Sequence, residues 1–287
     1  MSPEIWEANL THGLVRFVDE GHGPVLLLIH GLGGNWQNWQ ANIAGLARCH
    51  RVVAPDLPGF GSSPPYRGAV TMTRYADTIV EFLDVLDIES AIVVGNSMGG
   101  LLAIEIAVRH PGRVRGIVLA CSAGIPLTTL RHRIILRPSV VALNAVLRGH
   151  RIRRAALASP AVRGAIAARI VHRPRQIDPE HLGAALDGLG TASLAPVLRA
   201  GLRYDARRQA PKVSCPTLIV WGRHDRLLPV WMGRQLHRMI AHSELVVWDD
   251  SAHCPMIEQP QRFNALVDAF ARSGLRRPVT DKLEGIQ

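Results

Sequence analysis

The sequence predicts an α/β protein with a mainly parallel, twisted sheet, helices on both of its faces and a helical insertion. Short apolar runs bounded by turn residues alternate with helical patterns, as they do in βαβ units. Several of these runs are apolar at every position, which is typical of strands that helices cover on both sides. After residue 123 the alternation stops, and a long stretch without strand signals follows.

The expected elements come in order along the chain. An antiparallel strand is expected at residues 14–18, and the other strand candidates are residues 24–29, 51–55, 91–95, 115–120, 217–221 and 244–248. Between residues 77 and 86, four apolar side chains recur at the i, i+3, i+4, i+7 spacing of an amphipathic helix: Ile79, Phe82, Leu83 and Leu86. Residues 101–110 predict another helix, which Pro111 and Gly112 end.

The break in the alternation predicts the domain organisation. Residues 124–212 are rich in Ala, Leu, Ile, Val and Arg and are interrupted by prolines. We therefore expect a helical cap at 124–212, inserted into an α/β core made of residues 1–123 and 213–273. The tail, residues 274–287, has no apolar periodicity and is expected to be flexible.

Composition favours a soluble cytoplasmic protein. No stretch of the 287 residues approaches the roughly 20 apolar residues of a membrane span. The first residues lack the basic and apolar regions of a signal peptide. The four cysteines lie far apart and without CxxC spacing, which argues against a disulfide scaffold and against a zinc knuckle. We expect them to be reduced.

The positive charge belongs to one segment. Residues 126–212 hold 16 basic and 4 acidic residues, so this segment carries a formal charge of +12 and the rest of the chain −2. Such a block can attract anionic lipid or nucleic acid. Its single aromatic residue is Tyr204, so the stacking platform of single-strand binders is missing. We expect no nucleic-acid partner and at most a weak contact with an anionic membrane surface. Nothing in the sequence predicts an oligomeric state.

Ser97 is the candidate nucleophile. It lies in Gly95-Asn96-Ser97-Met98-Gly99, directly after an apolar run and directly before a helical stretch. A sharp turn that lifts one side chain above a sheet brings backbone segments too close for most Cβ atoms, which explains the glycines. The pattern therefore predicts a serine presented on a strand-to-helix turn.

A serine hydroxyl needs a general base and a third group that orients the base. Asp225 and His253 follow two successive predicted strands, so both are expected at the carboxyl edge of the sheet. The chain order Ser, Asp, His is that of a known hydrolase triad. Asp249 and Asp250 compete for the orienting role, but they stand just before His253 and are interpreted as loop-capping groups.

Acyl transfer also needs N–H groups that stabilise an oxyanion. The amide of Met98 follows the nucleophile, and the amide of Leu32 lies in the glycine-rich segment after the strand at 24–29. No cofactor and no metal are expected. Metal-site spacing such as HExxH is missing, and the pattern Gly31-x-Gly33 lacks the third glycine of a dinucleotide site because residue 36 is Trp.

The chain resembles the α/β-hydrolase fold family through five motifs: His30-Gly31, Asp56-Leu57-Pro58-Gly59-Phe60-Gly61, Gly95 to Gly99, Gly222-Arg223-His224-Asp225, and His253-x-Pro255-x-x-Glu258-x-Pro260. The resemblance implies an eight-stranded core, a helical cap after the sixth strand and a triad of Ser97, His253 and Asp225. Related dehalogenases and epoxide hydrolases carry Asp at the position of Ser97, so neither chemistry is expected.

The resemblance leaves more than one activity open. Asn96-Ser97-Met98-Gly99-Gly100 is similar to the turn of hydrolases that cleave carbon–carbon bonds in ring-fission (meta-cleavage) products. The short loop at residues 30–35 and the sequence Cys254-Pro255-Met256-Ile257 look more like those of carboxylesterases and lipases.

We favour a serine hydrolase that cleaves carboxylic esters through an acyl-enzyme. The aliphatic residues at 134–136 and 140–143 predict an apolar acyl or aryl pocket. Carbon–carbon hydrolysis is the alternative activity, and a non-catalytic ligand-binding protein of the same fold is a third interpretation.

Overall fold

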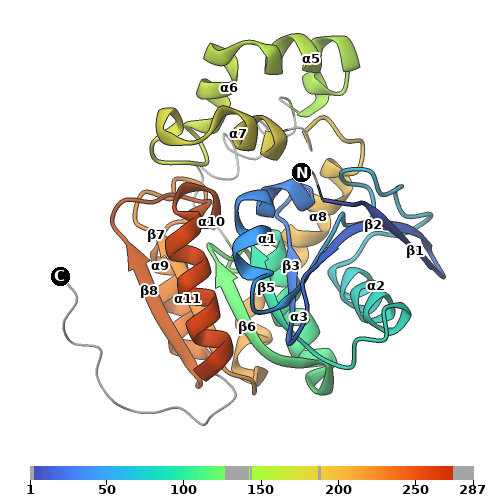
Figure 1. Ribbon diagram of the computed structural model, residues 1–287, viewed down its shortest axis with the longest axis vertical. Helices are drawn as coiled ribbons and strands as arrows, with labels where there is room; N and C mark the ends of the chain where they lie inside the picture. The colour runs from blue at the N-terminus through green and yellow to red at the C-terminus, as the bar shows by residue number, and fades with distance from the viewer. Residues whose placement is uncertain (1–2, 127–141, 143, 187–188, 274–287) are drawn as a thin grey trace.

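Eight strands form one mixed sheet in the computed structural model, which describes residues 3–126, 142, 144–186 and 189–273 (Figure 1). Their spatial order is β1-β2-β4-β3-β5-β6-β7-β8. β1 and β2 are antiparallel to their neighbours, and the other pairs are parallel. The bounds are Trp6–Leu10 (β1), Gly13–Glu20 (β2), Val25–Ile29 (β3), Arg51–Pro55 (β4), Ala91–Asn96 (β5), Val114–Ala120 (β6), Thr217–Gly222 (β7) and Ser243–Trp248 (β8). The predicted mainly parallel sheet is confirmed, and so are the eight strands that the resemblance implied.

Sequence patterning missed one strand, β1. Its burial alternates weakly, because Ala8 is its one buried residue and Trp6 is 48% exposed. An edge strand with one solvent-facing side offers little apolar signal, so β1 is defined by its pairing with β2 and not by its composition. The other predicted strands correspond to β2 through β8.

Helices cover both faces of the sheet. Residues of α2 (Met72–Val85), α3 (Met98–Arg109) and α9 (Trp231–Met239) pack in one hydrophobic cluster with Leu27 and Ile29. Residues of α1 (Gln40–Leu46), α10 (Pro255–Glu258) and α11 (Pro260–Ser273) pack in a second cluster with Leu26 and Leu28. Successive residues of β3 therefore face opposite layers, as the pleat requires.

Two predicted helices begin earlier than their apolar spacing indicated. The helix expected at residues 77–86 is α2, which begins at Met72 because the side chain of Thr71 accepts a hydrogen bond from the Arg74 N–H. The helix expected at residues 101–110 is α3, and it begins directly after Ser97. The first residue of α2 is therefore fixed by the Thr71 cap, and that of α3 by the turn at Ser97, rather than by the apolar spacing.

Helices joined by turns form the described part of the segment after β6. It contains α5 (His150–Ala158), α6 (Pro160–Ala167), α7 (Pro179–Leu186) and α8 (Leu194–Arg203), and no strand occurs among the described residues of 124–212. Helices α5, α6 and α7 lie above the ends of the strands, on the side toward which the parallel strands point (Figure 1). Ala167, Val171 and Leu182 belong to the same cluster as α1 and α11. The division into core and cap stays a prediction, and the predicted flexible tail lies outside the described residues.

Two further properties bear on earlier expectations. In the described ranges, no helix is both long enough and apolar enough to cross a membrane. Cys49, Cys121, Cys215 and Cys254 are all free thiols.

Candidate active site

Ser97 occupies the sharp turn between β5 and α3. Its φ angle is 53°, a left-handed conformation that is strained for a residue with a side chain. A Cβ atom on Gly95 would lie 2.2 Å from the carbonyl carbon of Gly99, and one on Gly99 would lie 2.1 Å from the oxygen of Ile29. The turn therefore requires glycine on both sides of Ser97. The structure shows the strand-to-helix turn that the sequence predicted.

The hydroxyl of Ser97 is not used for capping. Ser97 stands at the N-cap of α3, but its side chain accepts no hydrogen bond from the first turn of this fully described helix. Ser97 is half-buried and lines a cavity together with Asp225 and His253. Its Oγ is therefore presented to that cavity.

Leu32 and Met98 contribute the two predicted N–H donors, and both residues line the same cavity. A Cβ on Gly31 would lie 3.2 Å from Ser97 Cβ, so the loop with Leu32 passes directly beside the serine. Neither amide N–H has an acceptor among the described residues. Met98 also begins α3, where the helix dipole favours negative charge. Both groups are free to bind an oxyanion beside Ser97.

His30 holds the loop of Leu32 in place, a role that the sequence reasoning did not assign. Its Nδ1 lies 2.8 Å from the Gly31 oxygen, and its Nε2 lies 3.0 Å from the Leu57 amide nitrogen. Burial lowers the pKa of His30 to about 4, so the ring is neutral. Because Nε2 accepts from Leu57, the proton is assigned to Nδ1, which donates to Gly31. The ring thus ties the loop after β3 to the loop after β4.

Asp56 has a structural role in the loop after β4. Its two carboxylate oxygens accept hydrogen bonds from the amides of Trp36 (2.8 Å) and Ser62 (2.7 Å). Burial raises the pKa of Asp56, while the two amides and Arg16 oppose that change. Asp56 therefore fastens the glycine-rich turn after β4 to the start of the helical turn Trp36–Trp39.

The structure brings His253 and Asp225 together. His253 Nδ1 lies 2.7 Å from Asp225 Oδ2, and both residues are 6% exposed. The other oxygen of Asp225 accepts hydrogen bonds from the amides of Leu227 and Leu228, each at 2.9 Å. Within the described chain no hydrogen bond joins Ser97 Oγ to His253 Nε2, although both side chains line one cavity. Catalytic hydrogen bonds commonly tighten only when substrate binds.

The two competing carboxylates lie elsewhere. Asp249 pairs with Arg223, and Asp250 pairs with Arg262 at 3.3 Å, in both cases between exposed side chains. Both carboxylates thus have a surface arginine as a partner. Asp225 is the carboxylate that contacts His253.

Asn96 is a second residue that the sequence reasoning missed. Its Nδ2 donates to the carbonyl oxygens of Ala120 and His253, at 3.0 Å each. One buried side chain therefore joins the turn of Ser97, the end of β6 and the loop of His253. Its place beside the nucleophile was visible in the sequence, but its partner lies 157 residues away.

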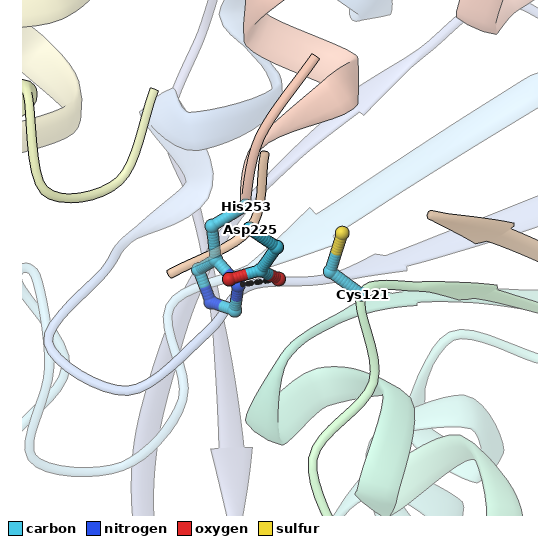
Figure 2. A group of neighbouring side chains, drawn as sticks. All are labelled: Cys121, Asp225 and His253. Carbon is cyan, nitrogen blue, oxygen red and sulfur yellow. Dashed lines mark hydrogen bonds and ion pairs between the residues drawn. The ribbon is translucent and has the colours of Figure 1, made fainter. Parts of the chain in front are cut away.

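Cys121 lies beside the Asp225–His253 pair (Figure 2). The ligand atoms of these three side chains lie within 4.8 Å of one another, a spacing that could hold a metal ion. A metal would need a thiolate, but burial and the nearby charge of Asp225 raise the pKa of Cys121 well above its ordinary value. Asp225 also already occupies Nδ1 of His253. These donors suit an acid–base pair and do not fit a metal ion.

The cavity above Ser97 has a volume of about 860 Å³. Its walls are mostly aliphatic side chains from the insertion and the core: Leu101, Ile125, Leu147, Ile166, Ile170, Leu186, Leu189, Leu194, Val197, Leu198, Leu202, Leu227 and Leu228. The aliphatic segments that predicted an apolar pocket lie outside the described residues, except for Ala142. Other parts of the insertion thus supply the apolar walls.

Comparison with known proteins identifies the family. The profile of the alpha/beta hydrolase family matches residues 26–266, which include Ser97, Asp225 and His253. The chain belongs to the alpha/beta hydrolase family. This alpha/beta hydrolase is 32% identical to 2-hydroxymuconate semialdehyde hydrolase of Pseudomonas sp. (strain CF600), over 94% of both chains. It is 31% identical to pimeloyl-[acyl-carrier protein] methyl ester esterase of Neisseria meningitidis, over 87% of this chain and 93% of the relative.

A solved structure agrees with this assignment. A thermophilic esterase from Thermogutta terrifontis superposes on this alpha/beta hydrolase with a TM-score of 0.76 and 25% identity. The match covers 94% of this chain and 99% of the esterase. The relatives thus include a methyl ester esterase and a semialdehyde hydrolase.

Proposed function

We propose that this protein is a serine hydrolase that cleaves carboxylic esters with apolar acyl or aryl groups. The observation that carries the proposal is the 2.7 Å contact of His253 Nδ1 with Asp225 Oδ2, in a cavity that Ser97 also lines. A buried carboxylate that fixes one imidazole nitrogen leaves the other nitrogen to act as a general base. The aliphatic walls of the cavity support the choice of apolar substrates.

In the proposed reaction, Ser97 Oγ attacks the ester carbonyl carbon while His253 Nε2 takes the hydroxyl proton. The oxyanion accepts hydrogen bonds from the N–H groups of Leu32 and Met98. His253 then gives the proton to the departing alcohol as the C–O bond breaks, which leaves an acyl group on Ser97. The same imidazole deprotonates a water molecule that attacks the acyl carbon, and the proton returns to Ser97 Oγ as the acid leaves.

A second candidate is hydrolysis of a carbon–carbon bond in a meta-cleavage product. The identity to 2-hydroxymuconate semialdehyde hydrolase over nearly the whole chain favours it. So does the turn sequence Asn96-Ser97-Met98-Gly99-Gly100. The same serine, histidine and oxyanion donors would act on a ketone or aldehyde carbonyl in place of an ester, so substrate trials must separate the two.

The deciding experiment is the hydrolysis of p-nitrophenyl esters from acetyl to long acyl chains. We expect turnover by the native protein and a loss of about a thousandfold or more in kcat/KM for Ser97→Ala. The exposed Ser214→Ala is the control and should leave the rate unchanged. The preferred chain length then measures the depth of the cavity.

The alternative has its own readout. Decay of 2-hydroxymuconate semialdehyde absorbance by the native protein, without ester turnover, would assign the carbon–carbon reaction instead. Turnover of neither substrate class would overturn the enzymatic proposal and favour a non-catalytic binding role.

We place this reaction in the cytoplasm. The support is the state of the cysteines, since all four are free thiols, as proteins of a reducing compartment usually have. Burial raises the pKa of Cys121 and Cys254 well above the ordinary thiol value, so both stay protonated beside the site.

A further inference from the structure

The loop that carries His253 is hydrogen-bonded to the segment that follows α6. The amide nitrogen of His253 donates a hydrogen bond to the carbonyl oxygen of Ile170 at 2.9 Å. Ile170 lies shortly after α6 and also lines the cavity. The backbone of the predicted base is therefore bonded directly to the segment that covers its pocket.

Glu258 forms a second link between the same two segments. Its Oε1 accepts from the amide of Ala252 at 2.8 Å and from Ser251 Oγ at 3.1 Å, both just before His253. Its Oε2 accepts from the amide of His172 at 2.6 Å. One oxygen of this carboxylate thus accepts hydrogen bonds from the His253 loop, and the other accepts one from the segment after α6.

The ring of His172 forms a third link. It stacks on the ring of His224 with centroids 3.9 Å apart and an interplanar angle of 4°. His224 directly precedes Asp225, the partner of His253. Residues 170–172 therefore contact both loops that carry the acid–base pair.

These contacts can affect the position of the imidazole. In the proposed reaction, His253 keeps Nδ1 on Asp225 and directs Nε2 toward Ser97. Its backbone is fixed by two hydrogen bonds: the His253 N–H donates to the oxygen of Ile170, and the His253 oxygen accepts from the side chain of Asn96. Glu258 holds the two residues that lead into it. Rate losses of a hundredfold can follow from a misplacement of about 1 Å, so such support matters for chemistry.

We propose that Glu258 is a positioning residue that joins segment 170–172 of the insertion to the His253 loop and so aligns the catalytic base. This inference rests on the proposed function, because alignment matters only if His253 acts on Ser97. It adds that the insertion supports the base as well as enclosing the substrate.

The test is Glu258→Gln, which keeps one carbonyl acceptor and replaces the other oxygen with an NH₂ group that cannot accept. We expect kcat on a p-nitrophenyl ester to fall about tenfold or more while KM changes little, because Glu258 does not line the cavity. Amide hydrogen exchange should become faster in residues 170–172 and 251–253 together. Asp250→Asn, in the same loop but paired with surface Arg262, is the control and should change neither.

Two results would overturn the proposal. One is an unchanged kcat in folded Glu258→Gln, even with a lowered melting temperature, since a purely structural role gives that pattern. The other is amide exchange that stays unchanged in both segments, because the link would then be absent. If the native protein hydrolyses no ester, the proposed function fails, while the exchange experiment still reports on the link.

Discussion

At the scale of single residues, the partners of two buried histidines decide what each can do. His253 has the carboxylate of Asp225 on Nδ1, so Nε2 is left for the proton transfer that we propose. His30 has only backbone partners, one acceptor and one donor, and this pair requires a neutral ring with its proton on Nδ1. The first arrangement suits the proposed proton transfer, and the second fixes the loop of Leu32.

His30 should make stability depend on pH. Burial lowers the pKa of His30 from 6.5 to about 4. Between these two pH values the imidazole is protonated in the unfolded chain but neutral in the folded chain. The free energy of unfolding should therefore fall as pH drops through this window, with about 2 kcal/mol lost from this group by pH 5. Urea denaturation at pH 7.5 and pH 5 measures the change.

The control for this prediction is a pair of histidine variants. In His30→Asn the difference in stability between the two pH values should shrink by about 2 kcal/mol, whereas His22→Asn, an exposed site, should behave as the native protein. An equal pH dependence in His30→Asn and the native protein would show that His30 is not the group responsible.

At the scale of elements, the packing of β5, α3 and β3 leaves no room for side chains at the nucleophile turn. Gly99 faces the backbone of Ile29 and His30, and Gly95 faces Gly99 itself. This close approach also brings the oxyanion loop beside Ser97. The same close packing thus strains the backbone of Ser97 and brings the loop of Leu32 next to it.

Gly99→Ala should lower the free energy of unfolding by about 1–3 kcal/mol, because its Cβ would overlap the oxygen of Ile29. Gly164→Ala is a matched control in the middle of α6, where a Cβ would meet nothing within 4 Å. It should stabilise the protein by about 0.5–1 kcal/mol through helix propensity. Denaturant titrations of both variants check this, and equal effects would contradict the steric argument.

At the scale of the whole molecule, charge and exposed apolar side chains gather on one part of the insertion, which we call the cap crest (residues 144–177). It contains eight arginines, no Asp or Glu, and no Phe, Tyr or Trp. Val146, Ile152 and Val162 are exposed there by 56%, 54% and 38%. Helices α5 and α6 of the crest lie farthest from the sheet (Figure 1).

We expect the cap crest to bind vesicles that contain anionic phospholipid, because surface arginines gain about 1 kcal/mol each near such a membrane and the aliphatic side chains can enter its interface. Co-sedimentation should rise with the anionic fraction and weaken steeply with salt. The triple variant Arg148→Gln, Arg151→Gln, Arg154→Gln should bind several-fold less, with ester hydrolysis in solution unchanged.

A control triple of exposed arginines away from the crest, Arg67→Gln, Arg234→Gln and Arg238→Gln, has the same change of charge and should bind as the native protein. Equal losses in the two triples would show that net charge alone acts. Absent or salt-insensitive binding would remove the membrane contact altogether.

The sequence by itself determined the parallel strands, the helices between β6 and β7 and the order of Ser97, Asp225 and His253. These features are local: a strand buried on both faces is apolar throughout, and a sharp strand-to-helix turn demands glycines at fixed positions. It also predicted that Leu32 and Met98 lie near Ser97, because both follow strands that end on the same side of the sheet. The sequence did not predict strand β1, because an exposed edge strand has little apolar pattern.

Only the tertiary structure decided which carboxylate contacts His253, what fixes the loop of Leu32 and how the segment after β6 reaches the cavity. Asp225, Asp249 and Asp250 are all near a strand end in sequence, and packing directs one to His253 and two to surface arginines. Glu258 meets His172 across 86 residues of chain. Contacts between such distant segments depend on how whole layers pack, and no local pattern of residues encodes them.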